Sequence, residues 1–484
     1  MFLGIDIGTT STKAVLIDAN QVMIASATAG YAESDPATGR NEIDPRLWLD
    51  AVRGVVGQLR HSAPRELCAT TAVGLSGQMH TLVTLDRDFH PVRPAILWSD
   101  GRGEEESRLL REGVAEVGEL TGVLPMPSFT APKLLWLRRT FPVEFGRIAH
   151  VLWPKDFVRH WLTGELVTDA SDAAGGQLLD ERQRIWADRV LEFVGVPRER
   201  LPRLQEGTEV SGVLRPEVAA DLGLPAGIPV AAGGGDAATS AVGLGCVREG
   251  RAFISLGTGA VFLAAQDAYR PQPEALLHTF AHCLPARWYR MAAMLNGASC
   301  LAWVARLCNE SDIDSLLGRV AARGSAPGRI LFQPYLQGER TPYNDVAARG
   351  AFIGLDAASD SVDLARAVLE GVAYSLRLGQ ELLAPRAEDL SFIGLVGGGA
   401  RSALWSEIVA SILGRPLAIV EDADCVAALG AARVSMIAMG APLTDVAALP
   451  RVARTVEPER RWAVAYSERF GRFRKAYAAL RPLT

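Results

Sequence analysis

The chain has 484 residues, a formal net charge of −5, a hydrophobic share of 49% and a charged share of 22%. This composition is typical of a folded globular chain and excludes intrinsic disorder, and the length predicts about two to four domains. The slightly acidic balance lacks a nucleic-acid-binding footprint, and no signal-peptide pattern or apolar run of roughly 20 residues is present, so we expect a cytoplasmic protein without nucleic-acid or membrane partners.

The first predicted element is a β-hairpin at the start of the chain. Residues 2–7 (FLGIDI) form one apolar run and residues 13–17 a second, with a polar turn led by Gly8 between them. Residues 46–62 have the spacing of a helix, and residues 71–77 read as a strand that ends in glycine. Residues 228–232 predict a further strand, which runs into three glycines and Asp236.

The second half of the chain repeats this pattern. Residues 253–256 and 260–263 predict another hairpin, and its turn sequence ISLGTG aligns with IDIGTT of the first hairpin. Residues 392–396 predict a strand that enters Gly397–Gly399 and opens a helix at about 401–413. Near the end of the chain, aromatic and apolar residues recur at helical spacing and predict an amphipathic packing helix; a membrane-surface role is the lesser alternative.

The repeated layout predicts a duplicated α/β fold with two halves and a central cleft. We place the boundary near residues 246–250, with domains 1–246 and 247–484. Ligands of open α/β sheets bind outside the carboxyl ends of the strands. Because the candidate motifs come from both halves, we expect the site in the cleft between them.

Asp6 and the turn Gly8–Thr10 form the first candidate site. A carboxylate beside free backbone N–H groups and hydroxyls suits a phosphate that carries Mg²⁺, since the acid can hold the metal or its waters. Taken alone, an ordinary Asp-containing hairpin turn is the better interpretation. The second turn, Gly257–Gly259, favours the interpretation as a phosphate site, because two such turns could hold one polyphosphate from both sides. The sequence lacks a Walker motif, which excludes a P-loop NTPase.

Asp236 is the second candidate. Gly233–Gly235 would allow the backbone to approach a ligand, and the carboxylate could then accept a proton from a substrate hydroxyl during phosphoryl transfer. Capping of the following helix is at least as good an interpretation of this residue by itself.

Two further groups suggest binding surfaces. Gly397–Gly399 before a helix would let a base or ribose lie on the backbone, whereas close helix–strand packing is the alternative. Gln78–His80 and Trp98–Arg102 mix polar side chains with an aromatic face, as a sugar site does. Singly, His80 fits a structural histidine and Trp98 a core residue. The turn 338–342 (GERTP) has no role that physical reasoning assigns.

These segments resemble the FGGY carbohydrate kinases, a family with the actin/hexokinase-like ATPase fold. The phosphate motifs match at residues 6–10 and 255–258, and the adenosine motif matches at residues 397–400. The two family signatures correspond to residues 128–136 and to residues 350–355 with 363–370. Only four of the 50 basic residues are lysines, and three of them fall inside matching segments: Lys13, Lys133 and Lys155.

The resemblance implies ATP-dependent sugar phosphorylation with Mg²⁺. Segments 77–80, 95–102, 154–156, 171–175 and 338–342 resemble the branch that phosphorylates D-xylulose in D-xylose catabolism. Asp236 would be the catalytic base. Asp6 would be a second acidic residue needed for activity, and it would be the metal ligand. Sugar contacts are expected at Met79, His80, Trp98, Asp100, Arg102 and Asp236. ATP contacts are expected at Gly8, Thr9, Thr10, Lys13, Gly257, Thr258, Gly259, Gly398, Gly399 and Ala400.

Two alternatives stay open at this point. The substrate could be another ketose or polyol, such as ribulose, fuculose or glycerol. The chain could also be a non-catalytic, nucleotide-gated binding protein of the actin-like fold, although a pure switch would need no base directed at a sugar. The expected partners are a small sugar and ATP, with a homodimer as an open option.

Overall fold

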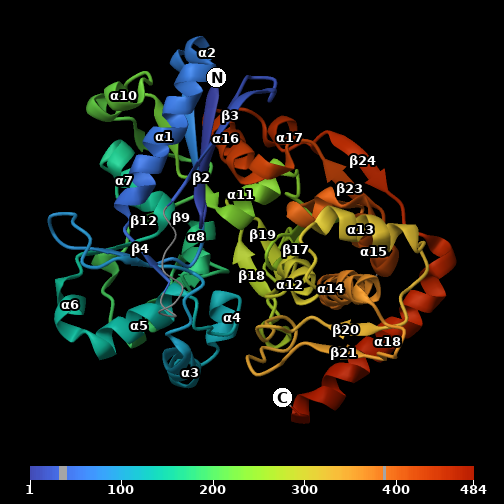
Figure 1. The fold of residues 1–484 in the computed structure, drawn as a ribbon. Helices are drawn as coiled ribbons and strands as arrows, with labels where there is room; N and C mark the ends of the chain where they lie inside the picture. Colours follow the sequence, from blue (N-terminus) through green and yellow to red (C-terminus); the bar gives the residue numbers. More distant parts are fainter. Residues whose placement is uncertain (32–40, 385–388, 484) are drawn as a thin grey trace.

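The computed structural model describes residues 1–31, 41–384 and 389–483, and the chain forms two α/β halves side by side (Figure 1). Each half contains a seven-stranded sheet. The N-terminal sheet comprises β13 (Val210–Val213), β14 (Pro229–Ala231), β5 (Ala72–Gly77), β1 (Phe2–Ile7), β2 (Ser11–Ile17) and β3 (Met23–Gly30) in that order, with β15 (Gly234–Gly235) also paired to β5. The C-terminal sheet comprises, in order, β18 (His278–Ala281), β19 (Trp288–Met294), β17 (Ala260–Gln266), β16 (Arg251–Leu256), β22 (Phe392–Val396), β23 (Leu417–Val420) and β24 (Val452–Val456).

The two sheets share the same central arrangement of strands, which confirms the predicted duplication. β1 pairs antiparallel with β2 and parallel with β5. β16 likewise pairs antiparallel with β17 and parallel with β22. The predicted hairpins and the strand at 392–396 are therefore present, and so is the strand predicted at 71–77, which begins at Ala72. The strand predicted at 228–232 is shorter, because β14 ends at Ala231 and the glycines that follow form β15.

Helices cover both sheets. In the N-terminal half they are α1 (Arg46–Ser62), α2 (Pro64–Cys68), α3 (Glu104–Gly113), α4 (Val117–Thr121), α5 (Thr130–Thr140), α6 (Pro142–Arg147), α7 (Pro154–Thr163), α8 (Ala170–Gly175), α9 (Asp188–Val194), α10 (Pro216–Leu222) and α11 (Asp236–Gly243). In the C-terminal half they are α12 (Ser299–Leu307), α13 (Ile313–Ala322), α14 (Ser361–Leu383), α15 (Ala403–Leu413), α16 (Val426–Ala438), α17 (Leu443–Val446) and α18 (Ala463–Leu480). None of these helices is both long and apolar enough to cross a membrane.

In the described part of the chain, five small two-stranded sheets complete the fold. They are β4 (Glu42–Ile43) with β7 (Ala95–Ile96), β6 (Val83–Leu85) with β8 (His150–Leu152), β9 (Val167–Asp169) with β12 (Arg203–Gln205), β10 (Leu179–Asp180) with β11 (Ile185–Trp186), and β20 (Leu331–Gln333) with β21 (Ala351–Ile353). The predicted helix at 46–62 matches α1, whereas the helix predicted from about 401 begins at Ala403, after a single 3₁₀ turn. Tyr466, Phe470 and Phe473 of α18 are buried, as expected of a packing helix.

Side-chain alternation in the first strand of each sheet directs a polar residue toward the cleft. Leu3, Ile5 and Ile7 of β1 pack in one core with α1, so Asp6 projects from the other face. In β16, Ile254 and Leu256 pack with α14 and α15, so Ser255 projects from the other face. Asp6 and Ser255 occupy equivalent positions in IDIGTT and ISLGTG and line the same pocket.

One helix of the C-terminal half covers the N-terminal sheet. α16 contacts β1, β2 and β5, and it also crosses α11 (Figure 1). The backbones approach so closely that a Cβ at Gly4 would lie 1.9 Å from the Ala428 carbonyl oxygen, and one at Gly74 would lie 1.8 Å from that of Ala431. Glycine is required at both positions, since real Cβ contacts do not fall below 3.0 Å. A helix from beyond residue 250 therefore packs on the N-terminal sheet. The domain boundary near residues 246–250 stays a prediction.

Candidate active site

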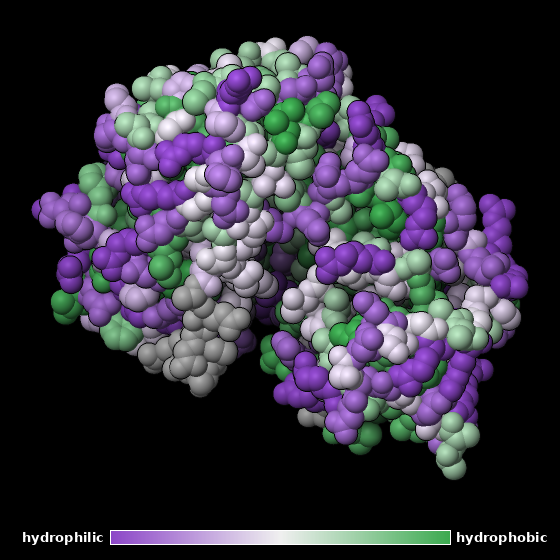
Figure 2. Space-filling model, turned by 45° about the horizontal axis from the view of Figure 1, so that its top comes forward, coloured by the Kyte–Doolittle hydropathy of each residue, from purple (hydrophilic) through white to green (hydrophobic). Residues whose placement is uncertain are grey.

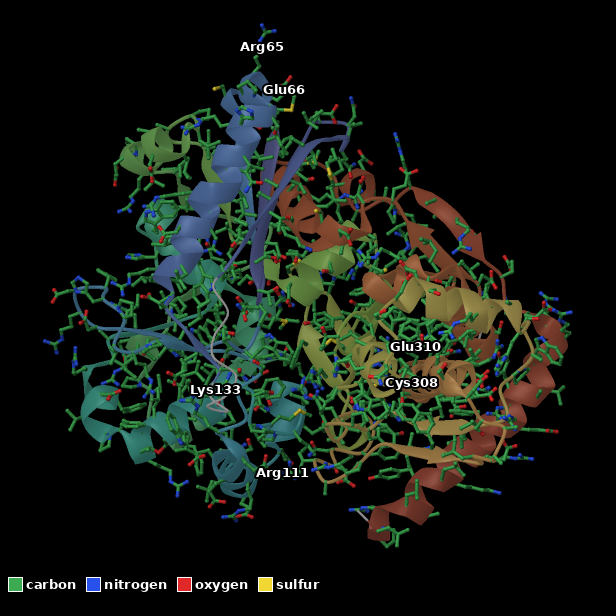
Figure 3. All side chains as sticks on the ribbon, in the orientation of Figure 1. Arg65, Glu66, Arg111, Lys133, Cys308 and Glu310 are labelled. Carbon is green, nitrogen blue, oxygen red and sulfur yellow. The ribbon has the colours of Figure 1, made fainter. Side chains whose placement is uncertain are left out.

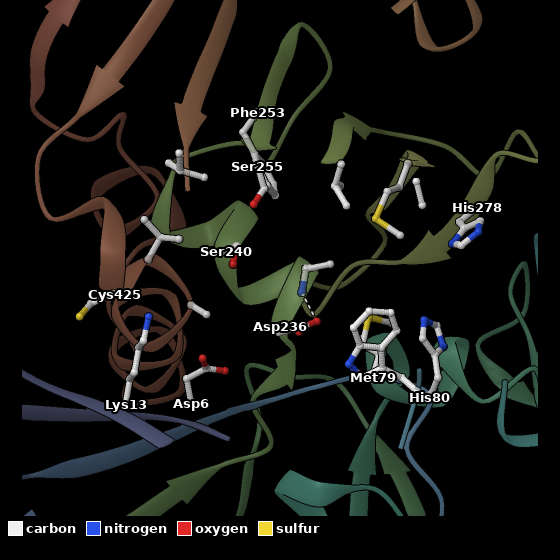
Figure 4. Close-up of a pocket in the computed structure, with 18 of the residues that line it drawn as sticks. Asp6, Lys13, Met79, His80, Asp236, Ser240, Phe253, Ser255, His278 and Cys425 are labelled. Carbon is white, nitrogen blue, oxygen red and sulfur yellow. Dashed lines mark hydrogen bonds between the residues drawn. The ribbon is translucent and has the colours of Figure 1, made fainter. Parts of the chain in front are cut away.

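A pocket of about 390 Å³ lies between the two halves. Figure 2 shows the surface hollowed at this junction, and Figure 4 shows the pocket itself. Residues from both halves line it, as the placement of the motifs predicted. Six of the predicted site residues are among them: Asp6, Lys13, Met79, His80, Trp98 and Asp236.

Asp6 stands beside the phosphate-like turn and next to a lysine. In the β1–β2 register it lies opposite Lys13, and Ser76 donates its hydroxyl to the Asp6 Oδ1 atom at 2.7 Å. The Lys13 ammonium donates to the carbonyl oxygen of Asp424 at 2.7 Å, which ties this edge of the pocket to the C-terminal half. Burial raises the pKa of Asp6, while the Ser76 hydrogen bond and the Lys13 charge oppose that rise.

Asp236 is the first residue of α11, and its side chain faces the pocket (Figure 4). Gly235 is the N-cap, so Asp236 is not itself the capping residue, although its Oδ1 atom accepts a hydrogen bond from the Ala237 N–H at 2.8 Å. Burial, and next the charge of Asp6, raise its pKa to about 7. A carboxylate with this pKa is half ionised near neutral pH and is well matched to exchange a proton with a hydroxyl.

A buried ionic cluster supports the backbone in front of Asp236. The N–H of Gly235 donates to Ser171 Oγ at 3.0 Å, and this hydroxyl donates to Asp169 Oδ2 at 2.5 Å. Asp169 in turn pairs with Lys155 at 3.0 Å, and both side chains are fully buried. Burial alone would lower the pKa of Lys155, but neighbouring carboxylates raise it above the ordinary value, so the lysine stays charged. Lys155 thus anchors the turn that carries Asp236.

The glycine triplet before Asp236 is explained by close packing. Gly233 has φ +75°, and a Cβ there would lie 2.0 Å from the Leu75 carbonyl oxygen. A Cβ at Gly235 would lie 2.6 Å from the Met79 Cγ atom. The triplet therefore lets the strand press against β5 and brings Asp236 beside Met79.

The tips of the two hairpin turns are accessible to solvent. Thr10 and Thr258 are exposed at their tips. The second turn is fastened to the start of α12, because Ala298 N–H donates to the Gly257 carbonyl at 2.7 Å and Ser299 Oγ donates to the Thr258 carbonyl at 2.8 Å. Gly8–Thr10 and Gly257–Gly259 are not among the residues lining the pocket itself.

Trp98 links the sugar-like segment to the first turn. Its indole N–H donates to Thr9 Oγ1 at 2.7 Å. An indole N–H can only donate, so the Thr9 oxygen accepts this bond and its own hydrogen is free to point at another acceptor, as a phosphate oxygen would be. Trp98 is only partly buried and lines the pocket, so the alternative of a core tryptophan does not hold.

His80 and Met79 form the wall opposite Asp6 and Lys13 (Figure 4). The His80 Nδ1 atom lies 2.5 Å from the Gly175 carbonyl oxygen, which can only accept, so Nδ1 carries the hydrogen. Burial holds the pKa of His80 well below its usual range, and the ring is neutral. Its Nε2 atom is then an acceptor, which suits a substrate hydroxyl.

Lys133 fixes the two sugar-like segments relative to each other. Its ammonium donates to the carbonyl oxygens of Leu97 at 2.8 Å and His80 at 3.1 Å. Figure 3 shows this residue inside the N-terminal half, in contrast to Arg65 and Glu66 at its outer tip. Burial holds the pKa of Lys133 well below its usual range. This lysine therefore has a structural role in shaping the pocket.

Asp100 and Arg102 are not brought into the pocket lining. They pair with each other at 2.6 Å, and Arg102 also pairs with Glu42 at 2.6 Å. Asp100 accepts a hydrogen bond from the Asn41 N–H at 2.9 Å. Both side chains are thus committed to holding the segment that carries Trp98. Their expected sugar contacts stay a prediction.

The adenosine-like motif is partly explained by packing. Gly397 has φ +93°, and Cβ atoms at Gly397 and Gly399 would lie 2.8 and 2.5 Å from atoms of Leu256. Close packing on β16 therefore accounts for these two glycines. Gly398 is exposed, Gly397 is half-buried and Ala400 is buried, so Gly398 is the member of the triplet most open to a ligand.

Among the pocket residues that sequence reasoning missed are two basic side chains, His278 and Arg340. His278 lies on β18 without any surrounding motif that could have identified it. Arg340 belongs to the GERTP turn, which stood out in the sequence but had no assigned role. Both come from the C-terminal half and lie on the same pocket as His80.

The donor set suits a divalent cation that accompanies a nucleotide. Asp6 and Asp236 both face the pocket, and the charge of Asp6 helps to raise the pKa of Asp236. The two side chains thus place carboxylate oxygens on the same pocket as the Lys13 ammonium. Oxygen ligands of this kind are those that Mg²⁺ prefers, and it takes few of them from the protein when it binds with phosphates.

Comparison with known proteins gives full-length matches. Residues 1–243 match the N-terminal domain of the FGGY family of carbohydrate kinases, and residues 252–439 match its C-terminal domain. A xylulose kinase from Escherichia coli (strain K12) is 40% identical over 487 residues, which cover 100% of both chains.

Solved structures agree over the same length. A structure titled as a "xyloylose kinase" from Brucella ovis has 42% identity and a TM-score of 0.95, with 100% of both chains covered. A xylulose kinase from Rhodospirillum rubrum has 30% identity and a TM-score of 0.91, covering 100% of this chain and 99% of that one.

Proposed function

The chain belongs to the FGGY family of carbohydrate kinases, and from this premise we propose that it transfers the γ-phosphate of ATP to D-xylulose. The products would be D-xylulose 5-phosphate and ADP. The observation that carries this proposal is Asp236, a partly buried carboxylate with a pKa of about 7 in a pocket between two phosphate-type hairpins. The full-length likeness to xylulose kinases supports the choice of sugar.

In the proposed reaction, the sugar lies with its terminal hydroxyl at Asp236. The hydroxyl oxygen attacks the γ-phosphorus while its proton passes to the Asp236 carboxylate, and the bond to the β-phosphate oxygen breaks to release ADP. The turns Gly8–Thr10 and Gly257–Gly259 would hold the phosphates, with Thr9 as a hydroxyl donor. The protein contributes mainly alignment and charge stabilisation.

Asp6 would hold Mg²⁺ directly or through water, and Lys13 would balance the remaining charge. When bound, this ion neutralises charge on the β- and γ-phosphates. The adenosine would lie along Gly398–Ala400, in the C-terminal half.

A substrate panel tests the proposed function. We expect kcat/KM for D-xylulose to exceed that for D-ribulose by roughly 10- to 150-fold, because the wrong epimer leaves a buried polar partner unsatisfied at about 1–3 kcal/mol per group. ADP release would be measured for both sugars, for L-ribulose and for glycerol, with a sugar-free baseline. Equal or better use of ribulose or glycerol would reject xylulose but keep a kinase. ADP release with none of them would favour the binding-protein alternative.

The pH profile tests Asp236 as the base. Only its carboxylate form can accept the proton, and its raised pKa means that it is protonated below about pH 7. We therefore expect kcat/KM for the sugar to rise with pH, to reach half its maximum near pH 7, and to level off above it. Initial rates from pH 5.5 to 9 at saturating ATP and Mg²⁺ would measure this. A profile that is flat between pH 6 and 8 would contradict the assignment.

A further inference from the structure

His278 is a buried polar side chain without a partner. It is 0% exposed, and within the described part of the chain neither of its ring nitrogens has a hydrogen-bond partner. Phe129 and Phe280 pack around the ring at centroid distances of 5.6 and 5.3 Å. Buried polar groups in folded proteins are nearly always paired, so an orphaned ring that lines a binding pocket indicates that the ligand supplies the partner.

Arg340 is a cation in the same pocket, and the opposite charge that acts on it is that of its chain neighbour Glu339. None of the described carboxylates forms an ion pair with it, and its only side-chain hydrogen bond in that part of the chain is a long one of 3.4 Å to Ser128 Oγ. Its backbone, by contrast, is firmly held. The Arg340 N–H donates to Glu339 at 2.8 Å, and Thr341 donates to the Leu276 carbonyl oxygen at 3.0 Å. The guanidinium therefore projects from a fixed turn into the pocket.

The two residues share one end of the pocket with His80. The rings of His80 and His278 both pack on Phe129, at centroid distances of 4.4 and 5.6 Å, and Arg340 lines the same pocket. Figure 4 shows His80 and His278 on one side of Asp236, and Asp6 with Lys13 on the other. A sugar whose reacting hydroxyl lies at Asp236 would thus extend its far end toward His278 and Arg340.

The hydrogen-bonding capacity of the two groups matches the far end of a ketose. Burial lowers the pKa of His278 to about 3, so the ring is neutral, with one N–H donor and one acceptor nitrogen. A hydroxyl group can both donate and accept, and it can satisfy such a ring. A guanidinium only donates, and it needs an acceptor such as a carbonyl oxygen. In a 2-ketose these groups are adjacent, as the C1 hydroxyl and the C2 carbonyl.

We infer that His278 binds the C1 hydroxyl and Arg340 the C2 carbonyl oxygen of the ketose, so that the C-terminal half recognises the end of the sugar that does not react. This inference rests on the proposed function, because it assumes that the terminal hydroxyl at Asp236 is C5. It gives a role to the GERTP turn, and it makes sugar recognition a joint property of both halves.

The test removes the same hydrogen bond from the protein and from the sugar. In the unaltered enzyme, 1-deoxy-D-xylulose should have a kcat/KM lower than that of D-xylulose by roughly 10-fold or more, because it leaves His278 unpaired. In His278→Phe, which keeps an aromatic ring, the two sugars should be used within about threefold of each other. His282→Phe is the matched control, because His282 is equally buried but does not line the pocket. It should keep the full preference for D-xylulose.

Arg340→Met should raise KM for D-xylulose roughly 10- to 150-fold, the range for a lost charge-assisted hydrogen bond, with KM for ATP unchanged. Arg340→Lys should recover part of this loss, and Arg306→Met on the exposed face of α12 is the surface control. Sugar binding followed by Trp fluorescence without ATP should weaken to the same extent as KM rises.

Two results would overturn the inference. One is a His278→Phe enzyme that still prefers D-xylulose to its 1-deoxy analogue as strongly as the unaltered enzyme does. The other is an Arg340→Met enzyme that loses kcat but not sugar affinity, as expected of a purely structural contact with Ser128. An unaltered enzyme that does not phosphorylate D-xylulose would instead reject the proposed function, so the two failures are distinguishable.

Discussion

Replacing Asp236 with Asn should reduce sugar phosphorylation by roughly 10²- to 10⁴-fold while ATP binding stays near that of the unaltered enzyme. The amide has the shape of the carboxyl group but cannot accept the hydroxyl proton. Its effect should fall on kcat, since the sugar can still occupy the pocket. Steady-state ADP release would give kcat and KM, and nucleotide binding would be measured separately by calorimetry.

The control for this variant is Asp188→Asn. Asp188 is also the first residue of a helix, α9, but its side chain is 77% exposed and lies outside the pocket. That substitution should leave turnover unchanged, and both variants should unfold at temperatures close to that of the unaltered protein. Turnover of Asp236→Asn within a fewfold of the unaltered enzyme would remove Asp236 from the role of base.

Replacing Asp6 with Asn should lower turnover by roughly 10²- to 10³-fold, a loss typical of one missing electrostatic contact to the reacting group. The side chain keeps its acceptor for Ser76 but loses the charge that would hold Mg²⁺ near the phosphates. Because Asp6 and His80 lie on opposite sides of Asp236, sugar affinity should change little (Figure 4). The Mg²⁺ concentration that gives half-maximal rate at fixed ATP should increase.

The comparison for Asp6→Asn is Asp50→Asn, at a residue of α1 whose side chain is 70% exposed. Activity and Mg²⁺ dependence should both be unchanged in that variant. If the Asp6 variant shows the same Mg²⁺ curve and the same turnover as the unaltered enzyme, the metal assignment fails while Asp236 can still be the base.

Local pattern was sufficient to predict the architecture. The apolar run at residues 2–7 and the glycine-led turn after it predicted a hairpin, and a second copy of that pattern near residue 254 indicated a duplicated fold. The glycines at the turns marked the ends of these strands. Both signals depend on short-range spacing, which a single sequence contains. The extent of the strand at 228–232 depended on how Gly233 packs against Leu75, and that contact lies far away in sequence.

The site was only partly predictable for the same reason. Asp6 and Asp236 stood beside glycine turns, so their local sequence identified them. His278 has no such context, and it reaches the pocket only because β18 pairs with β19 at the sheet edge. Arg102 looked equally suited to a sugar site, yet Asp100 and Glu42 occupy its guanidinium. Whether a polar side chain is already paired cannot be read from spacing.

Because α16 packs on the N-terminal sheet, it affects when the N-terminal half can fold during synthesis. Residues 1–246 leave the ribosome first, but the helix that shields Val15 and Ile17 is Val426–Ala438. The growing N-terminal half therefore has an open apolar face throughout most of translation. Its final packing must wait for a segment that emerges near the end of synthesis. The N-terminal half therefore completes its fold only when the chain is almost complete, and the two halves do not fold one after the other.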